Sequence, residues 1–142
     1  MGDLTANFSR SEFACKCGCG FDTVDIQTVS ALQFCVDSYK KTSGGRAVSM
    51  TINCGCRCKQ HNDDLRNLFN STGGKQGENT APNSQHIYGR AADVVLIVDQ
   101  VQVEPKEVSA FFATNFPKYS IGTYSTFTHV DSRSNGPARW TL

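Results

Sequence analysis

The sequence lacks two features that would point to common classes of partner, namely an excess of one charge and a long apolar run. It carries 14 Lys and Arg against 13 Asp and Glu, so its formal net charge at pH 7 is only +1. A near-neutral chain has no broad basic surface for phosphate backbones or anionic membranes, so we expect no nucleic-acid partner. No apolar stretch approaches the roughly 18 residues of a membrane-spanning helix, so we expect no membrane partner.

Residues 1–10 also lack the basic and then apolar pattern of a signal peptide. Ala6 stands where a myristoylation motif needs Ser or Thr, so no lipid anchor is expected at this end. These absences predict synthesis in the cytoplasm. A length of 142 residues is in the usual range of one domain, and we expect a single, monomeric domain over residues 1–142.

Cysteine, in contrast, is abundant, with seven residues. An odd number leaves at least one thiol outside any disulfide framework, and without an export signal reduced thiols or metal ligation are the better interpretation. Two Cys-x-Cys-x-Cys runs stand out, at 15–19 and at 54–58. Disulfides or a structural metal could join these runs, and both remain open because paired zinc ligands usually have two to four residues between them. Cys35 lies in a predicted helix and fits a small buried hydrophobe.

The hydrophobic pattern predicts a mixture of helices and strands. Ser9 and Glu12 form a capping box for a short helix entering Phe13, and apolar residues at helical spacing follow Asp22 as far as Ser43. Further helices are predicted over 59–69 and 105–116, and strands over 47–53, 92–98, 119–124 and 127–133. The strand over 92–98 is nearly all apolar and should be central and buried on both faces. This order predicts an α+β fold with a small, mainly antiparallel sheet flanked by helices.

Two of the three histidines in the sequence lie beside predicted core strands. His86 precedes Asp93 with six residues between them, and His129 lies on a later strand. A carboxylate that enters an apolar strand is costly unless a cation or metal pairs with it, and zinc held by two imidazoles and one carboxylate is a known catalytic arrangement. The spacing leaves a second interpretation open, in which the histidines are ordinary hydrogen-bonded residues and Asp93 pairs with Arg90 or Arg133.

Several ordered motifs together are more specific than this spacing. They are Phe8-Ser9-Arg10-Ser11-Glu12-Phe13, Cys56-Arg57-Cys58 with His61-Asn62, Ser84-Gln85-His86, Gly89-Arg90-Ala91-Ala92-Asp93, Gly122-Thr123-Tyr124 and His129-Val130-Asp131. In these motifs, over almost its whole length, the chain resembles the zinc D-Ala-D-Ala carboxypeptidase family. That family shares the hedgehog/D,D-peptidase fold with vancomycin-resistance D,D-dipeptidases, phage L-alanyl-D-glutamate endopeptidases and the hedgehog signalling domain.

The resemblance implies a zinc ion held by His86, Asp93 and His129. Zinc in such a site lowers the pKa of its bound water toward 7 and polarises the carbonyl that is attacked. The resemblance therefore implies hydrolysis of an amide bond.

The resemblance also places Arg57 in the substrate cleft, where its guanidinium could pair with a peptide carboxylate or stabilise a developing oxyanion. The alternative is a structural Arg57 that caps a helix or loop. Ser84 and Gln85 belong to the same motif as His86 and are expected to contact substrate. His61 is either a cleft residue or a solvated residue on a helix surface.

The sequence departs from the family at the general base. Related enzymes carry Glu, Asp or His two or three residues before the last zinc-binding histidine, but this chain has Phe127 and Thr126 there. Asp131 is the nearest carboxylate, and on an extended strand it shares a face with His129. Asp131 could act as general base or orient the histidine, or it could pair with Arg133 and take no part in the chemistry.

These residues predict a zinc peptidase that cuts a peptidoglycan stem peptide, with D-Ala-D-Ala carboxypeptidase and L-Ala-D-Glu endopeptidase activities both open. Such an enzyme would act on the cell wall in phage lysis, in a virion or in a bacterium. The alternative is a catalytically silent zinc-binding module, as in the hedgehog domain, that serves as a virion or cell-wall-binding component. The absence of a carboxylate at Thr126 favours this alternative.

Overall fold

Six strands form one mixed sheet in the computed structural model, which describes residues 2–142. Hydrogen-bonded neighbours follow the order β1-β2-β5-β4-β6, and β3 pairs with β2. All pairs are antiparallel except β4 with β6. The strands are β1 (Val48–Cys54), β2 (Ala91–Val98), β3 (Val101–Gln102), β4 (Ser120–Thr123), β5 (Thr128–Asp131) and β6 (Arg139–Thr141).

The helices begin where the sequence supplies capping groups. The Asp25 side chain accepts a hydrogen bond from the backbone N–H of Gln27 at the start of one helix, and Pro105 occupies the first turn of another. The Glu12 carboxylate accepts a hydrogen bond from the Ser9 backbone N–H. The helices are η1 (Arg10–Phe13), α1 (Ile26–Thr42), α2 (Lys59–Ser71), η2 (Gln85–Tyr88) and α3 (Pro105–Asn115).

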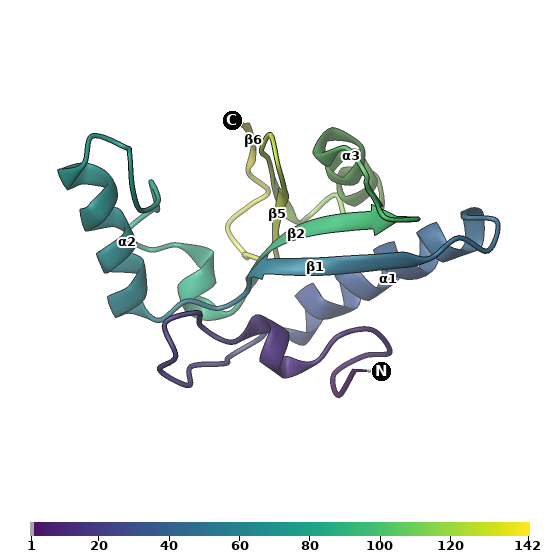
Figure 1. Ribbon diagram of the computed structural model, residues 1–142, viewed down its shortest axis with the longest axis horizontal. Helices are drawn as coiled ribbons and strands as arrows, with labels where there is room; N and C mark the ends of the chain where they lie inside the picture. Colours follow the sequence, from purple (N-terminus) through teal and green to yellow (C-terminus); the bar gives the residue numbers. More distant parts are fainter. Residues whose placement is uncertain (1) are drawn as a thin grey trace.

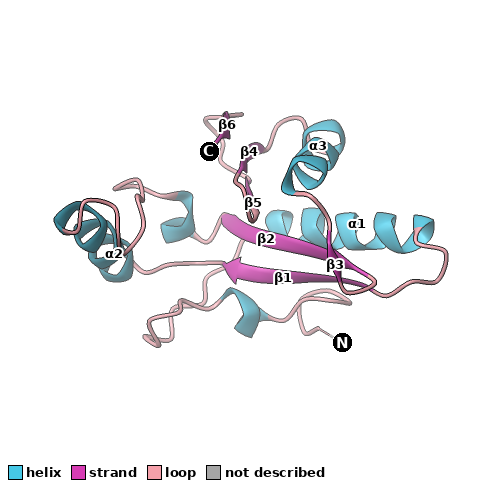
Figure 2. Cartoon of the chain, turned by 45° about the horizontal axis from the view of Figure 1, so that its top comes forward, coloured by secondary structure: helices cyan, strands magenta, loops and turns pink. Residues whose placement is uncertain are grey.

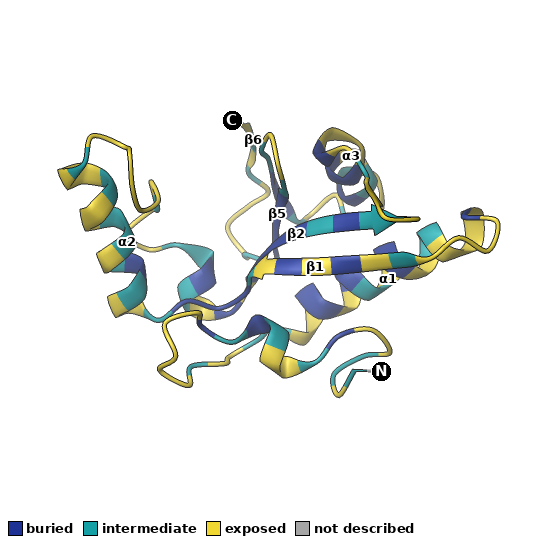
Figure 3. Ribbon diagram, in the orientation of Figure 1, coloured by how far each residue is buried: buried dark blue, intermediate teal, exposed yellow. Residues whose placement is uncertain are grey.

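The core lies between the sheet and two of the helices. α1 contacts β1 and β2, whereas α3 packs against β4 and β5. Figures 1 and 2 show α1 running along the sheet while α2 extends away at the opposite end, where the chain leaves β1. Figure 3 shows buried residues on β2 and on the side of α1 that faces the sheet. The largest fully buried side chains include Phe8, Phe13, Leu32, Leu96 and Phe112.

The predicted α+β architecture is confirmed, including the central place of β2 between β1 and β5. Three short elements were not predicted, namely η2, β3 and β6. A strand of two or three residues is too short to show a periodic pattern in the sequence. β6 is also a strand only through its hydrogen bonds to β4, a pairing that the local sequence does not reveal. Within residues 2–142, no helix combines the length and apolar character needed to cross a membrane.

Candidate active site

The two predicted histidine ligands and the predicted aspartate ligand lie together. The β2–β5 register pairs Asp93 directly with His129, and η2 delivers His86 just before β2 begins. Asp93 Oδ1 lies 2.9 Å from His129 Nδ1, and Asp93 Oδ2 lies 3.3 Å from His86 Nε2. All three residues are buried, so the carboxylate bridges the two rings with one oxygen facing each.

Each imidazole is held by its other nitrogen. His86 Nδ1 lies 2.6 Å from the carbonyl oxygen of Gly55, and His129 Nε2 lies 2.8 Å from Asp131 Oδ2. If these nitrogens carry the protons, the lone pairs of His86 Nε2 and His129 Nδ1 face Asp93. Metal-binding histidines are commonly oriented in this way by a carbonyl or a carboxylate. The donor set and its orientation therefore fit a zinc ion.

The Asp93 carboxylate and the two histidines shift one another's pKa values. Burial by itself would lower the pKa of His86, but the Asp93 carboxylate outweighs burial and raises that pKa to about 10. Burial would also raise the pKa of Asp93, but the two neighbouring histidines lower it well below its usual value. Asp93 is therefore a carboxylate, the form in which it can bind a metal.

Asp131 is fully buried, and both of its oxygens are engaged. Oδ2 accepts from His129 Nε2 and from Arg133 Nη2 at 2.6 Å, whereas Oδ1 accepts from the backbone N–H and Nε of Arg133. Burial would raise the pKa of Asp131, but these hydrogen bonds lower it to about 2. The geometry favours the interpretation in which Asp131 orients His129 over the one in which it accepts a proton from water.

A pocket of about 600 Å³ opens beside the three residues. Arg57, Ser84, Gln85 and Glu78 are among the residues that line it. His61 is not among the described residues that line the pocket. Ser84 also accepts a hydrogen bond from the backbone N–H of His86 and caps η2.

Arg57 is only 4% exposed, and both Nη atoms of its guanidinium have hydrogen-bond partners. Nη1 donates to Asn62, while Nη2 donates to Glu78 at 2.8 Å and to Cys54 Sγ at 3.3 Å. Among the described residues, two buried side-chain polar atoms have no hydrogen-bond partner, namely Arg57 Nε and Gln85 Oε1. Both belong to residues that line the pocket. A buried donor and a buried acceptor without partners can be satisfied by the carbonyl and amide groups of a bound peptide.

Glu78 and Trp140 are among the pocket residues that the sequence did not single out. Glu78 lies in the long loop after α2, where its ion pair with Arg57 could not be seen from spacing. Trp140 lies on β6, and its ring centroid is 5.1 Å from that of His129. The indole lies against Gly122, where an added Cβ would overlap the ring. A glycine within a strand pattern often marks such a close approach, and that signal could have pointed to a bulky neighbour.

Cys54 lies beside both the His86 ring and Asp93, its partner in the β1–β2 register. Its Sγ is 3.6 Å from His86 Nδ1, the nitrogen that faces the Gly55 carbonyl. Donor atoms of Cys54, His86 and Asp93 all fall within 4.8 Å of one another, so a cysteine ligand is compatible with distance alone. The thiol lies 3.6 Å from Nδ1, whereas Nε2 is the nitrogen that faces Asp93, so Cys54 is not beside the His86 nitrogen that would bind the metal.

The profile of one protein family, described as Peptidase M15, matches residues 6–131. The chain belongs to the peptidase M15 family. No curated protein and no solved structure matches the chain significantly. Membership of the M15 family supports a metallopeptidase with a peptide substrate, and the matched range includes both predicted histidine ligands and Asp93.

Proposed function

We propose that this chain is a zinc-dependent peptidase that hydrolyses an amide bond in peptidoglycan stem peptides. The proposal rests on the convergence of His86, Asp93 and His129 beside a pocket that contains a buried arginine. The Gly55 carbonyl and the Asp131 carboxylate orient the two imidazole rings through the nitrogens that point away from Asp93. Family membership supports the peptidase class. The cell-wall substrate rests on the resemblance of the motifs to D,D-carboxypeptidases and phage endopeptidases.

His86, Asp93 and His129 would hold the zinc ion, which supplies a Lewis acid that activates water and polarises the scissile carbonyl. Asp131 holds the His129 ring so that Nδ1 faces Asp93. Trp140 packs against the same ring and limits its rotation. The protein contributes a ligand set whose geometry is established before substrate arrives, which lowers the cost of reorganisation.

Arg57 and Glu78 form the part of the site that would bind a carboxylate of the substrate. Glu78 is 54% exposed at its side chain, whereas Arg57 is buried, so the carboxylate can leave more easily than the guanidinium. A carboxylate of the substrate can take the place of Glu78 and accept hydrogen bonds from Arg57. This exchange suits stem peptides, which carry free carboxylates.

The test combines zinc content with hydrolysis of purified stem peptides, using mass spectrometry to identify the bond that is cut. His86→Ala should remove one zinc ion per chain and abolish hydrolysis, whereas His61→Ala, a histidine outside the pocket, should change neither. A defined product from the wild type would also distinguish carboxypeptidase from endopeptidase action. A zinc content that is the same in the wild type and in His86→Ala would overturn the proposal.

One observation favours a second candidate, a zinc-binding module without catalysis that recognises the cell wall. Thr126 and Phe127 supply no carboxylate before His129, and the oxygens of Asp131 are fully engaged. Such a module would bind zinc through His86 and retain stem peptides, but it would release no product. The hydrolysis assay separates the two candidates, because both predict the same metal ligands.

A further inference from the structure

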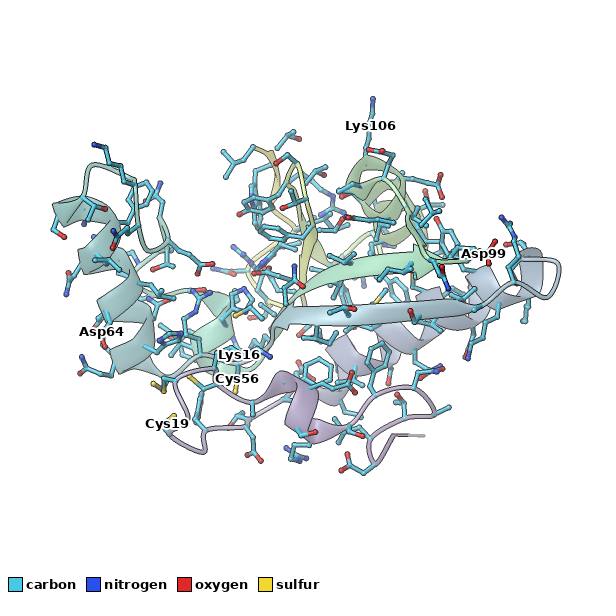
Figure 4. The ribbon with its side chains drawn as sticks, in the orientation of Figure 1. Lys16, Cys19, Cys56, Asp64, Asp99 and Lys106 are labelled. Atoms are coloured by element: carbon cyan, nitrogen blue, oxygen red, sulfur yellow. The ribbon has the colours of Figure 1, made fainter. Side chains whose placement is uncertain are left out.

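Four of the seven cysteines gather in one place, although they come from two distant parts of the sequence. The sulfur atoms of Cys15, Cys17, Cys19 and Cys58 all lie within 4.8 Å of one another. Figure 4 shows yellow sulfur atoms where the loop that carries Cys19 meets the beginning of α2. The cluster is separate from the candidate active site, because none of these four residues lines the pocket as described.

The other three cysteines have separate environments. Cys35 is buried in the core on α1, as its pattern predicted. Cys56 donates a hydrogen bond from Sγ to the Phe21 carbonyl at 3.1 Å, and Cys54 contacts His86. The three cysteines of the run at 54–58 therefore have three different environments, and only Cys58 lies with Cys15, Cys17 and Cys19. Four is the number of ligands that a structural zinc site takes.

The spacing of the sulfur atoms agrees with a tetrahedral centre. Zn–S bonds of about 2.3 Å place the corners of a regular tetrahedron about 3.8 Å apart. Cys15 Sγ lies 3.4 Å from Cys17 Sγ, and Cys17 Sγ lies 3.7 Å from Cys58 Sγ. Both distances lie slightly below that value, and the four sulfur atoms are within 4.8 Å of one another, so small side-chain rotations would complete the geometry.

Backbone N–H groups point at three of the four sulfur atoms. The N–H of Cys58 donates to Cys15 Sγ at 3.3 Å, that of His61 donates to Cys58 Sγ at 3.3 Å, and that of Phe21 donates to Cys19 Sγ at 3.4 Å. Cys58 is also the N-cap of α2, where the helix dipole favours negative charge. Such donors stabilise thiolates, the form in which cysteine binds zinc.

We propose that Cys15, Cys17, Cys19 and Cys58 bind a structural zinc ion as four thiolates, each thiol releasing its proton to solvent as the metal binds. The ion connects the loop between η1 and α1 to the first residue before α2. That connection also holds the backbone next to Arg57, whose N–H donates to the His86 carbonyl at 2.9 Å. The structural zinc thereby supports the wall of the peptide pocket without touching substrate.

The experiment measures zinc per chain in the full-length protein, purified under reducing conditions, for the wild type and three variants. The wild type should bind two zinc ions, and His86→Ala should keep one, because the thiolate site does not depend on that histidine. Cys17→Ser/Cys19→Ser changes exposed residues and should also leave one ion. Cys56→Ser, a cysteine of the same run outside the cluster, should leave both.

Cobalt(II) replacement in the wild type gives a readout that does not depend on a variant folding correctly. Four thiolates should produce intense thiolate-to-cobalt charge-transfer absorption, which His86→Ala should retain and Cys17→Ser/Cys19→Ser should lose. Absence of that absorption, or masses under non-reducing conditions that show disulfides among the four residues, would overturn the proposal. If the wild type bound only the thiolate-dependent ion and His86→Ala kept it unchanged, the proposed peptidase site would be contradicted and this one would stand.

Discussion

Replacing Asp131 with Asn tests how the protein orients a metal ligand. The Asp131 carboxylate accepts four hydrogen bonds, one from His129 and three from Arg133. The single oxygen of Asn can keep about half of them. If that oxygen stays with the backbone N–H and Nε of Arg133, the new NH₂ group faces His129 Nε2. His129 Nε2 must then accept a hydrogen bond instead of donating one.

The consequence for the metal follows from the tautomer. A His129 ring that accepts at Nε2 carries its proton on Nδ1, the nitrogen that faces Asp93. A protonated nitrogen cannot bind zinc, so we expect affinity to fall by about 10- to 100-fold, the usual range for residues that orient ligands. This corresponds to about 1.4 to 2.7 kcal/mol. Activity at limiting zinc should fall in parallel and recover partly when zinc is added.

The assay is competition for zinc against a chelating indicator, with unfolding in urea measured alongside to confirm that the variant is folded. Asp64→Asn is the control, because Asp64 is a carboxylate on α2 that accepts a hydrogen bond from Gln60 and is not among the described residues that line the pocket. Unchanged zinc affinity with reduced turnover would refute the orienting role and place Asp131 in the reaction itself. Unchanged affinity and turnover together would remove Asp131 from the site altogether.

Three further predictions concern other parts of the molecule. Arg57→Lys keeps the charge but loses the planar fork, so kcat/KM for carboxylate-bearing peptides should fall at least about 10-fold while zinc content stays constant. Gly122→Ala places a methyl group against Trp140, so the fluorescence of this single tryptophan should shift and hydrolysis should weaken without loss of zinc. Phe112→Ala leaves a cavity in the core and should cost about 3 to 5 kcal/mol of unfolding free energy in urea, whereas activity per folded molecule should be retained.

The elements with long, regular patterns could be predicted from the sequence by itself. Seven apolar or β-branched positions in β2 made it a central strand, and Pro105 marked where α3 begins. The cap signal predicted at Asp22 lies three residues before Asp25, the N-cap of α1. The trio of His86, Asp93 and His129 was predicted from the resemblance of several ordered motifs, since the cost of a carboxylate in an apolar strand left pairing with Arg90 or Arg133 open. These features depend on local sequence, so periodicity and motif spacing are enough to reveal them.

The tertiary structure decided how distant residues meet. β6 and Trp140 join the site only because β6 pairs with β4, and Glu78 reaches Arg57 from a loop that has no pattern of its own. The two matching cysteine runs gave no indication that one would supply three members of a cluster and the other only Cys58. Hydrogen bonds and sulfur contacts between residues that are distant in the sequence depend on chain packing, which local pattern does not encode.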